Sequence, residues 1–151
     1  MWWAGDWEGT VAESYKLLEM EPNDPWAYYN AGYGHAMLGR NEEAIEAFSR
    51  AVALDPTDPN MPIGLAWGWA KAGQRDSALT VLAGVPDESG NLKEIAIVYG
   101  ELGDLDTAFA LLDRAAEEAP GSIGTLRTDH SADPLKADRR YDELLARVGL
   151  E

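Results

Sequence analysis

The sequence predicts an all-α protein made of antiparallel helix pairs that repeat along the chain. The first observation is spacing: Gly5, Gly39, Gly73 and Gly103, each at an expected turn, are separated by 34, 34 and 30 residues. The second is that apolar residues between these glycines form helical stripes. The third is composition, because 46% apolar residues, with six Trp and six Tyr, can form a continuous core and exclude general disorder.

The complete unit is residues 25–58. Its helices are expected at about Trp26–Leu38 and Asn41–Leu54, with Gly39 in the turn between them. Small residues let the two helices approach closely, while Tyr28 and Phe48 fill the remaining space. One such pair cannot bury its own apolar face, so neighbouring pairs must cover it.

The remaining segments are copies of this unit in altered form. Residues 1–24 are expected to be a half repeat with one helix at about Glu8–Met20. Residues 59–88 are a shortened repeat, because Gly84-Val85-Pro86 ends its second helix about a turn early. Residues 89–121 are a further repeat, with helices at about Asn91–Leu102 and Leu105–Glu118.

Residues 122–151 are expected to close the array as a C-terminal cap. Ser122–Arg127 could begin one helix, and a final helix is expected at about Arg139–Val148. Asp138 would cap its start and Gly149 its end. All five segments together are expected to form a single domain, residues 1–151.

The unit at residues 25–58 resembles the tetratricopeptide (TPR) repeat. The matching positions are Tyr28, Gly32, Gly39, Ala44, Phe48, Ala51 and Pro56. Two positions depart from the pattern, since Ala31 replaces the usual leucine and His35 the usual tyrosine. The resemblance implies a right-handed α-solenoid of about 3.5 TPR units with a C-terminal capping helix.

The tail adds a second resemblance. Residues 95–150 resemble the C-terminal end of TPR arrays attached to bacterial regulatory proteins, with Lys136, Arg139 and Tyr141 standing where those arrays have arginine, proline and phenylalanine. Such arrays follow kinase, cyclase or transcription-regulator domains. No such domain lies in this sequence, so none of those activities carries over.

The sequence contains no catalytic constellation. It has no cysteine, and its two histidines, His35 and His130, lie on separate segments without metal-binding spacing. No serine lies in a nucleophile elbow and no phosphate-binding loop is present. We therefore expect no enzymatic activity, no cofactor and no metal, with His35 in a packing position.

The charge and hydropathy of the chain restrict its partners. A net charge of −15 repels phosphate backbones, which argues against nucleic-acid binding. The same charge would attract basic partners, or would simply keep the protein soluble. No apolar run approaches the length of a membrane span and no signal peptide is recognisable, so we expect a cytoplasmic protein without membrane contact.

The TPR resemblance also implies a binding surface. In that family the first helix of each unit lines a concave groove, and aromatic residues there often carry binding energy. We expect an apolar or amphipathic peptide in this groove. One alternative is that no partner binds, because the chain's own tail fills the groove or the rings simply pack together. Another is a small-molecule pocket formed by Trp26, Tyr29, Tyr33 and Trp67. The groove residues are Trp26, Tyr29, Tyr33, Met37, Ile63, Trp67, Lys71, Lys93 and Ile97.

The N-terminal edge is a second expected surface, because the half repeat lacks its first helix. Trp2, Trp3, Trp7 and Val11 gather there. Three arrangements would cover them: the tryptophans fold back as a cap, two chains form a symmetric homodimer, or an upstream partner has been lost.

The sequence as a whole therefore predicts a non-catalytic protein–protein interaction scaffold, partner unknown. The alternative is a detached C-terminal regulatory or oligomerisation module of a bacterial signalling enzyme or transcription regulator.

Overall fold

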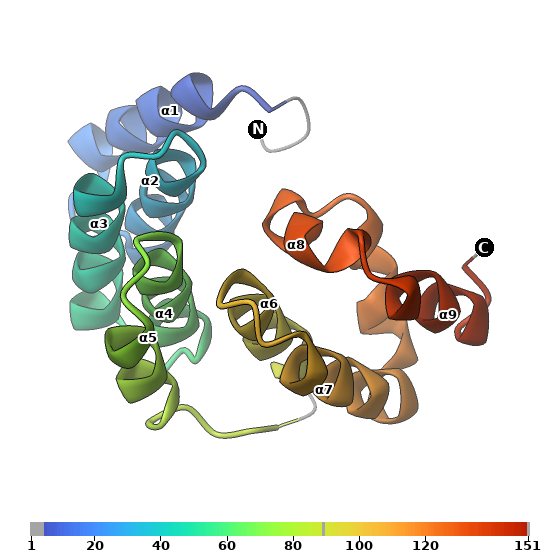
Figure 1. The fold of residues 1–151 in the computed structure, drawn as a ribbon. Helices are drawn as coiled ribbons and strands as arrows, with labels where there is room; N and C mark the ends of the chain where they lie inside the picture. The colour runs from blue at the N-terminus through green and yellow to red at the C-terminus, as the bar shows by residue number, and fades with distance from the viewer. Residues whose placement is uncertain (1–4, 89, 151) are drawn as a thin grey trace. The chain divides into compact units, whose positions relative to one another are not determined.

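The fold was analysed in a computed structural model that describes residues 5–88 and 90–150, and these residues contain helices and turns but no β-strand (Figure 1). The fold class is therefore all-helical, as predicted. The α-helices are α1 (Trp7–Met20), α2 (Pro25–Met37), α3 (Asn41–Leu54), α4 (Asn60–Lys71), α5 (Arg75–Leu82), α6 (Leu92–Glu101), α7 (Leu105–Glu118), α8 (Asp133–Lys136) and α9 (Arg139–Arg147). Two 3₁₀ helices, η1 (Pro120–Arg127) and η2 (His130–Ala132), lie between α7 and α8.

The chain divides into two compact units, Met1–Val85 and Pro86–Glu151. The division lies just after α5, which ends at Leu82 and is only 8 residues long. The early end of this helix, predicted from Gly84-Val85-Pro86, is confirmed. The expectation of a single domain stays a prediction.

The first unit has two layers of helices. Helix α2 packs between α1 and α3 and also contacts α4, while α4 packs on α3 and α5. Helices α2 and α4 thus form one layer, with α1, α3 and α5 on the other side (Figure 1). Gly34 permits the close approach of α1, because a Cβ there would lie 2.7 Å from Cγ2 of Val11.

The second unit is built on the pair α6 and α7. Helix α8 and η2 pack on α6, and α9 packs on α7. Four apolar residues of this C-terminal segment are buried: Leu135, Tyr141, Leu144 and Leu145 have exposed fractions of 0 to 9%. The final helix expected at about Arg139–Val148 is present as α9, and residues 120–127 form a 3₁₀ helix.

The end of the chain keeps the 34-residue register. Asp104 caps α7 and Asp138 caps α9, and ion pairs join residues 34 apart, at 2.8 Å between Arg140 and Asp106 and at 2.9 Å between Arg147 and Asp113. Helix α9 therefore lies where the second helix of a further repeat would stand. Hydrogen bonds from Arg140 hold the pKa of the Asp138 carboxyl at about 2.

The register glycines form equivalent turns. Gly5, Gly39, Gly73 and Gly103 all have positive φ, between 67° and 80°. This conformation is costly for other residues, so the spacing of these glycines marks where each second helix begins. Predicted and observed helix bounds accordingly agree within one residue for α1, α2, α6 and α9, and coincide for α3 and α7.

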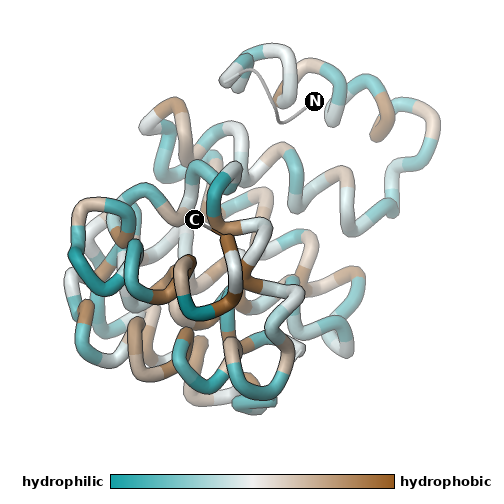
Figure 2. Tube along the Cα trace, turned by 90° about the vertical axis from the view of Figure 1, so that its right-hand side faces the viewer, coloured by the Kyte–Doolittle hydropathy of each residue, from teal (hydrophilic) through white to brown (hydrophobic). Residues whose placement is uncertain are grey.

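Hydrophobic and hydrophilic residues are interspersed along the helical parts of the chain (Figure 2). This pattern fits helices that bury one face and leave the other in water. Within residues 5–88 and 90–150, the structure contains no helix with the length and apolar character needed to span a bilayer.

Candidate functional site

Six rings form a continuous aromatic path through the first unit. Successive ring centroids along it lie 5.0 to 6.3 Å apart, within the range of favourable aromatic contacts. The path crosses helices α1 to α4. In order of contact its members are Trp26, Tyr29, Phe48, Trp67, Tyr33 and Trp7.

The centre of the path is a face-to-face stack of Tyr33 and Trp67. Their centroids are 5.0 Å apart with an interplanar angle of 19°. The two side chains come from α2 and α4, and their exposed fractions are 6% and 4%. The stack is thus a packed interface between first helices, with no room for a ligand between the two rings.

The two helices can approach because Gly64 lacks a side chain. A Cβ at this position would lie 2.6 Å from Cε2 of Tyr29 and 2.9 Å from Cε1 of Phe48. The repeat pattern of small and aromatic residues therefore creates the path as a consequence of helix packing.

The remaining groove residues of the first unit differ in exposure. Trp26 is 43% exposed, whereas Ile63 is 4% exposed and belongs to the core. Tyr29, Met37 and Lys71 are half-buried. The Lys71 ammonium lies 5.8 Å from the ring centroid of Trp67, which is a cation–π distance. Four groove residues are therefore at least partly accessible: Trp26, Tyr29, Met37 and Lys71.

Two buried polar atoms belong to side chains of α2 and α4. The indole Nε1 of Trp67 and the amide Oδ1 of Asn30 are buried and make no hydrogen bond within the described residues. A buried polar group without a partner costs roughly 1–3 kcal/mol.

Lys93 and Ile97 belong to the second unit. The Lys93 ammonium donates to Oγ1 of Thr125 at 2.6 Å and pairs with Glu94 at 3.0 Å. Ile97 is 5% exposed. Lys93 is thus engaged within its own unit, and Ile97 is a core residue.

The N-terminal edge differs from the expectation at the positions that are described. Val11 is 7% exposed and faces Gly34 of α2, so it is part of the core. Trp7 is half-buried and contacts Tyr33 at 5.6 Å. Trp2 and Trp3 lie outside the described residues. The large apolar side chains exposed on α1 are instead Tyr15, Leu17 and Met20.

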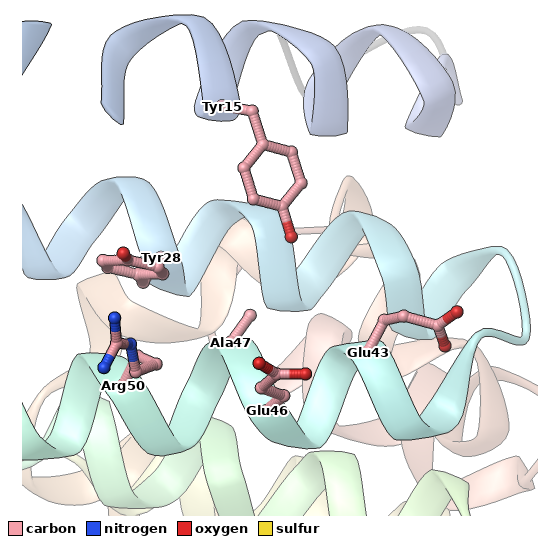
Figure 3. A pocket seen from close by; sticks show the side chains of 6 residues that line it. All are labelled: Tyr15, Tyr28, Glu43, Glu46, Ala47 and Arg50. Atoms are coloured by element: carbon pink, nitrogen blue, oxygen red, sulfur yellow. The ribbon is translucent and has the colours of Figure 1, made fainter. Parts of the chain in front are cut away.

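A surface pocket of about 260 Å³ lies on the first unit, among α1, α2 and α3 (Figure 3). Its lining residues, which we call the tyrosine–glutamate pocket, are Tyr15, Tyr28, Glu43, Glu46, Ala47 and Arg50. None of them was predicted as a site residue. The TPR resemblance places the binding groove on the first helix of each repeat, whereas this pocket lies mainly between α1 and α3, the second helices of two successive repeats. The available signal was the pair Glu43 and Glu46, three residues apart on α3 and therefore on one helix face.

His35 lies behind this pocket. Its Nε2 is 3.1 Å from the Tyr15 hydroxyl, and its Nδ1 is buried without a partner in the described part of the chain. Burial lowers the pKa of His35, an effect that Arg40 reinforces and that Glu43 and Glu8 oppose. Burial likewise raises the pKa of the Tyr15 hydroxyl, and Glu46 adds to the rise. The predicted packing role of His35 agrees with this burial.

The described residues contain no group of three or more His, Asp or Glu side chains able to hold a metal ion. What the geometry offers is an array of packed helix pairs with a partly open aromatic face and an acidic pocket. These features define a helical-repeat protein of the interaction class.

Residues 25–58 and residues 94–122 each match the tetratricopeptide repeat family, so these two segments are TPR repeats. Protein CTR9 homolog of Arabidopsis thaliana is 34% identical over 61 residues, which cover 40% of this chain and 6% of that protein. The chain therefore spans only a small part of that relative.

Two solved structures share the fold. The crystal structure of MamA has a TM-score of 0.52 at 20% identity, covering 95% of this chain and 85% of that chain. The MamA RS-1 ArsTM double mutant has a TM-score of 0.52 at 21% identity, covering 95% and 84%. At this identity the likeness concerns the fold alone.

Proposed function

We propose that this protein is a non-catalytic scaffold that binds an apolar or amphipathic peptide segment on the α2–α4 face of its first unit. TPR repeats imply a protein–protein interaction scaffold. The observation that carries the finer proposal is the aromatic path, which begins at the 43% exposed Trp26 and continues into the buried Tyr33–Trp67 stack.

The aromatic path favours binding because some of its rings are buried and others are exposed to solvent. Phe48, Tyr33 and Trp67 are packed, so they hold the face rigid before a partner arrives. Trp26 and Tyr29 contact each other at 5.2 Å and present ring surface to solvent. Preorganised aromatic surface loses little conformational entropy on binding.

Selection of peptides from a display library against the intact protein tests this proposal. We expect the selected peptides to be apolar or amphipathic and to bind Trp26→Ala at least about tenfold more weakly, since truncating an aromatic anchor costs about 1–2 kcal/mol or more. Met20→Ala is the matched control, because Met20 is 80% exposed on α1 and lies off this face. Peptides that bind Trp26→Ala and the wild type equally well would contradict the proposal.

The alternative, a regulatory or oligomerisation module of a bacterial signalling protein, has the support of one feature. Helix α9 and its Asp138 cap continue the 34-residue register into the segment that resembles those arrays. This feature supports the resemblance and says nothing of an attached activity, so the scaffold proposal is preferred.

A further inference from the structure

The tyrosine–glutamate pocket is separate from the α2–α4 face. Its side chains come mainly from α3, with Tyr15 from α1 and Tyr28 from α2, and none of them belongs to the aromatic path. A ligand in this pocket would therefore be recognised independently of a peptide on the α2–α4 face.

The volume restricts what the pocket can hold. Its 260 Å³ lies below the roughly 300–1,000 Å³ of clefts that enclose drug-sized ligands. Tyr15 is 44% exposed, and Glu43, Glu46 and Arg50 are exposed as well, so the pocket opens to solvent. A single long side chain projecting from a partner fits these dimensions.

The charge in the pocket is divided between two ends. Glu43 lies at one end and Glu46 follows it toward the middle, where the Tyr15 hydroxyl is directed toward α3, while Arg50 lies beside Tyr28 at the other end (Figure 3). Neither glutamate forms a salt bridge with any residue that the structure describes. Two uncompensated carboxylates on one helix face favour a cation between them.

The side chains at the acidic end, carboxylates beside an aromatic ring, favour a planar cation. A guanidinium donates in a fork that suits carboxylates and also stacks on aromatic rings, whereas an ammonium acts as a compact point charge. The pocket already holds such a contact, because the Arg50 guanidinium lies 5.6 Å from the ring centroid of Tyr28. Tyr15 supplies a second ring at the acidic end.

His35 fixes the second ring in place. Its Nε2 lies 3.1 Å from the Tyr15 hydroxyl, and the two ring centroids are 5.9 Å apart. His35 is itself only 6% exposed, so the contact anchors a surface tyrosine to the helix beneath it. The ring is thereby held before a ligand arrives.

We propose that the tyrosine–glutamate pocket binds the guanidinium of an arginine side chain on a protein partner, between Glu43 and Glu46 and against the ring of Tyr15. The net charge of −15 steers basic segments toward the protein, and this pocket gives such a segment a defined place to bind.

The test uses N-acetyl-arginine N-methylamide as probe, titrated into the intact protein and followed by nitrogen–proton correlation NMR. We expect shifts centred on Tyr15, Tyr28 and residues 43–50. The isosteric citrulline compound, which lacks the charge, should bind at least about tenfold more weakly, as should the lysine compound.

Glu43→Gln with Glu46→Gln should weaken binding of the probe about tenfold, which corresponds to about 1.4 kcal/mol. The matched control is Glu42→Gln with Glu117→Gln, which removes the same two charges from exposed positions outside the pocket and should leave binding within about twofold. Circular dichroism of both variants confirms that each is folded.

Three results would overturn the proposal. Equal binding of the citrulline compound would exclude charge recognition, and equal weakening in the control variant would show a general effect of net charge. If free arginine binds more than about tenfold more tightly than the blocked probe, the ligand is a free amino acid and not an arginine side chain of a protein partner.

Discussion

At the scale of single residues, the aromatic side chains divide between packing and exposure. Tyr33 and Trp67 occupy first-helix positions that the repeat pattern assigns to a groove, yet both are more than nine-tenths buried. Each ring gains more from stacking on the other than from contact with water, because burial of apolar surface and ring stacking act together. Among the described residues, Trp26 has a single ring neighbour, Tyr29, and it remains 43% exposed.

His35 replaces a usual tyrosine and makes the first unit sensitive to pH. Its pKa is lowered from 6.5, so below about pH 6.5 the unfolded chain binds more protons than the folded one. The stability contribution is complete above this pH and is lost as the pH falls toward the folded pKa. The charged and titratable groups that face His35 are Tyr15 and Glu8 of α1, Arg40 before α3, and Glu43 of α3.

The first prediction follows from this sign. Between about pH 7 and about pH 5, the free energy of unfolding should fall in the wild type by more than in His35→Gln, with a difference of at most about 1.4 kcal/mol per pH unit for one proton. Urea denaturation followed by tryptophan fluorescence measures it. Parallel slopes in wild type and His35→Gln would contradict the prediction.

At the scale of secondary-structure elements, the starts of the second helices show how the register is maintained. Asp6, Gln74 and Asp104 follow register glycines and have nearly the same backbone angles, with φ from −84° to −95° and ψ near 74°. Asp6 and Asp104 accept hydrogen bonds from backbone N–H groups of their helices, whereas Gln74 makes no such bond.

Gln74→Asp should therefore stabilise the protein, by about 1 kcal/mol, because the aspartate can accept from the N–H of Ser77 as Asp104 does from Thr107. The midpoint of urea denaturation, read by tryptophan fluorescence, checks the gain. Gln74→Glu is the matched control, since it adds the same charge on a side chain that caps poorly. A gain of equal size in Gln74→Glu would assign the effect to charge alone.

Helix positions were predictable from the sequence because they depend on local signals. Gly39 and Gly103 fix turns by their positive φ, and Pro86 follows the early end of α5. The candidate site was less predictable. Whether Tyr33 contacts water or Trp67 depends on residues that are distant in sequence, and repeat position alone does not decide it. The tyrosine–glutamate pocket likewise requires α1 and α3 to be placed on either side of α2.

At the scale of the whole molecule, the division into two compact units raises the question of whether each unit has its own free energy of unfolding. Repeat proteins are stabilised by contacts between neighbouring elements, and compact units within a chain can unfold at different free energies. All six tryptophans lie within residues 1–85, and residues 86–151 contain none. Tryptophan fluorescence thus reports on the first unit, while circular dichroism reports on the helices of both.

The last prediction uses this difference. Leu135 is fully buried and packs on Gly100 in the second unit, so Leu135→Ala should cost that unit about 2–5 kcal/mol. In urea, the circular dichroism of the variant should begin to change at lower concentration than its fluorescence, whose midpoint should stay near that of the wild type. Met61→Ala, at a fully buried position of the first unit, should instead shift the fluorescence midpoint. If both signals shift together in Leu135→Ala, the two units unfold as one and the single-domain expectation from the sequence holds, because the free energy lost at Leu135 would then be shared by every helix of the chain.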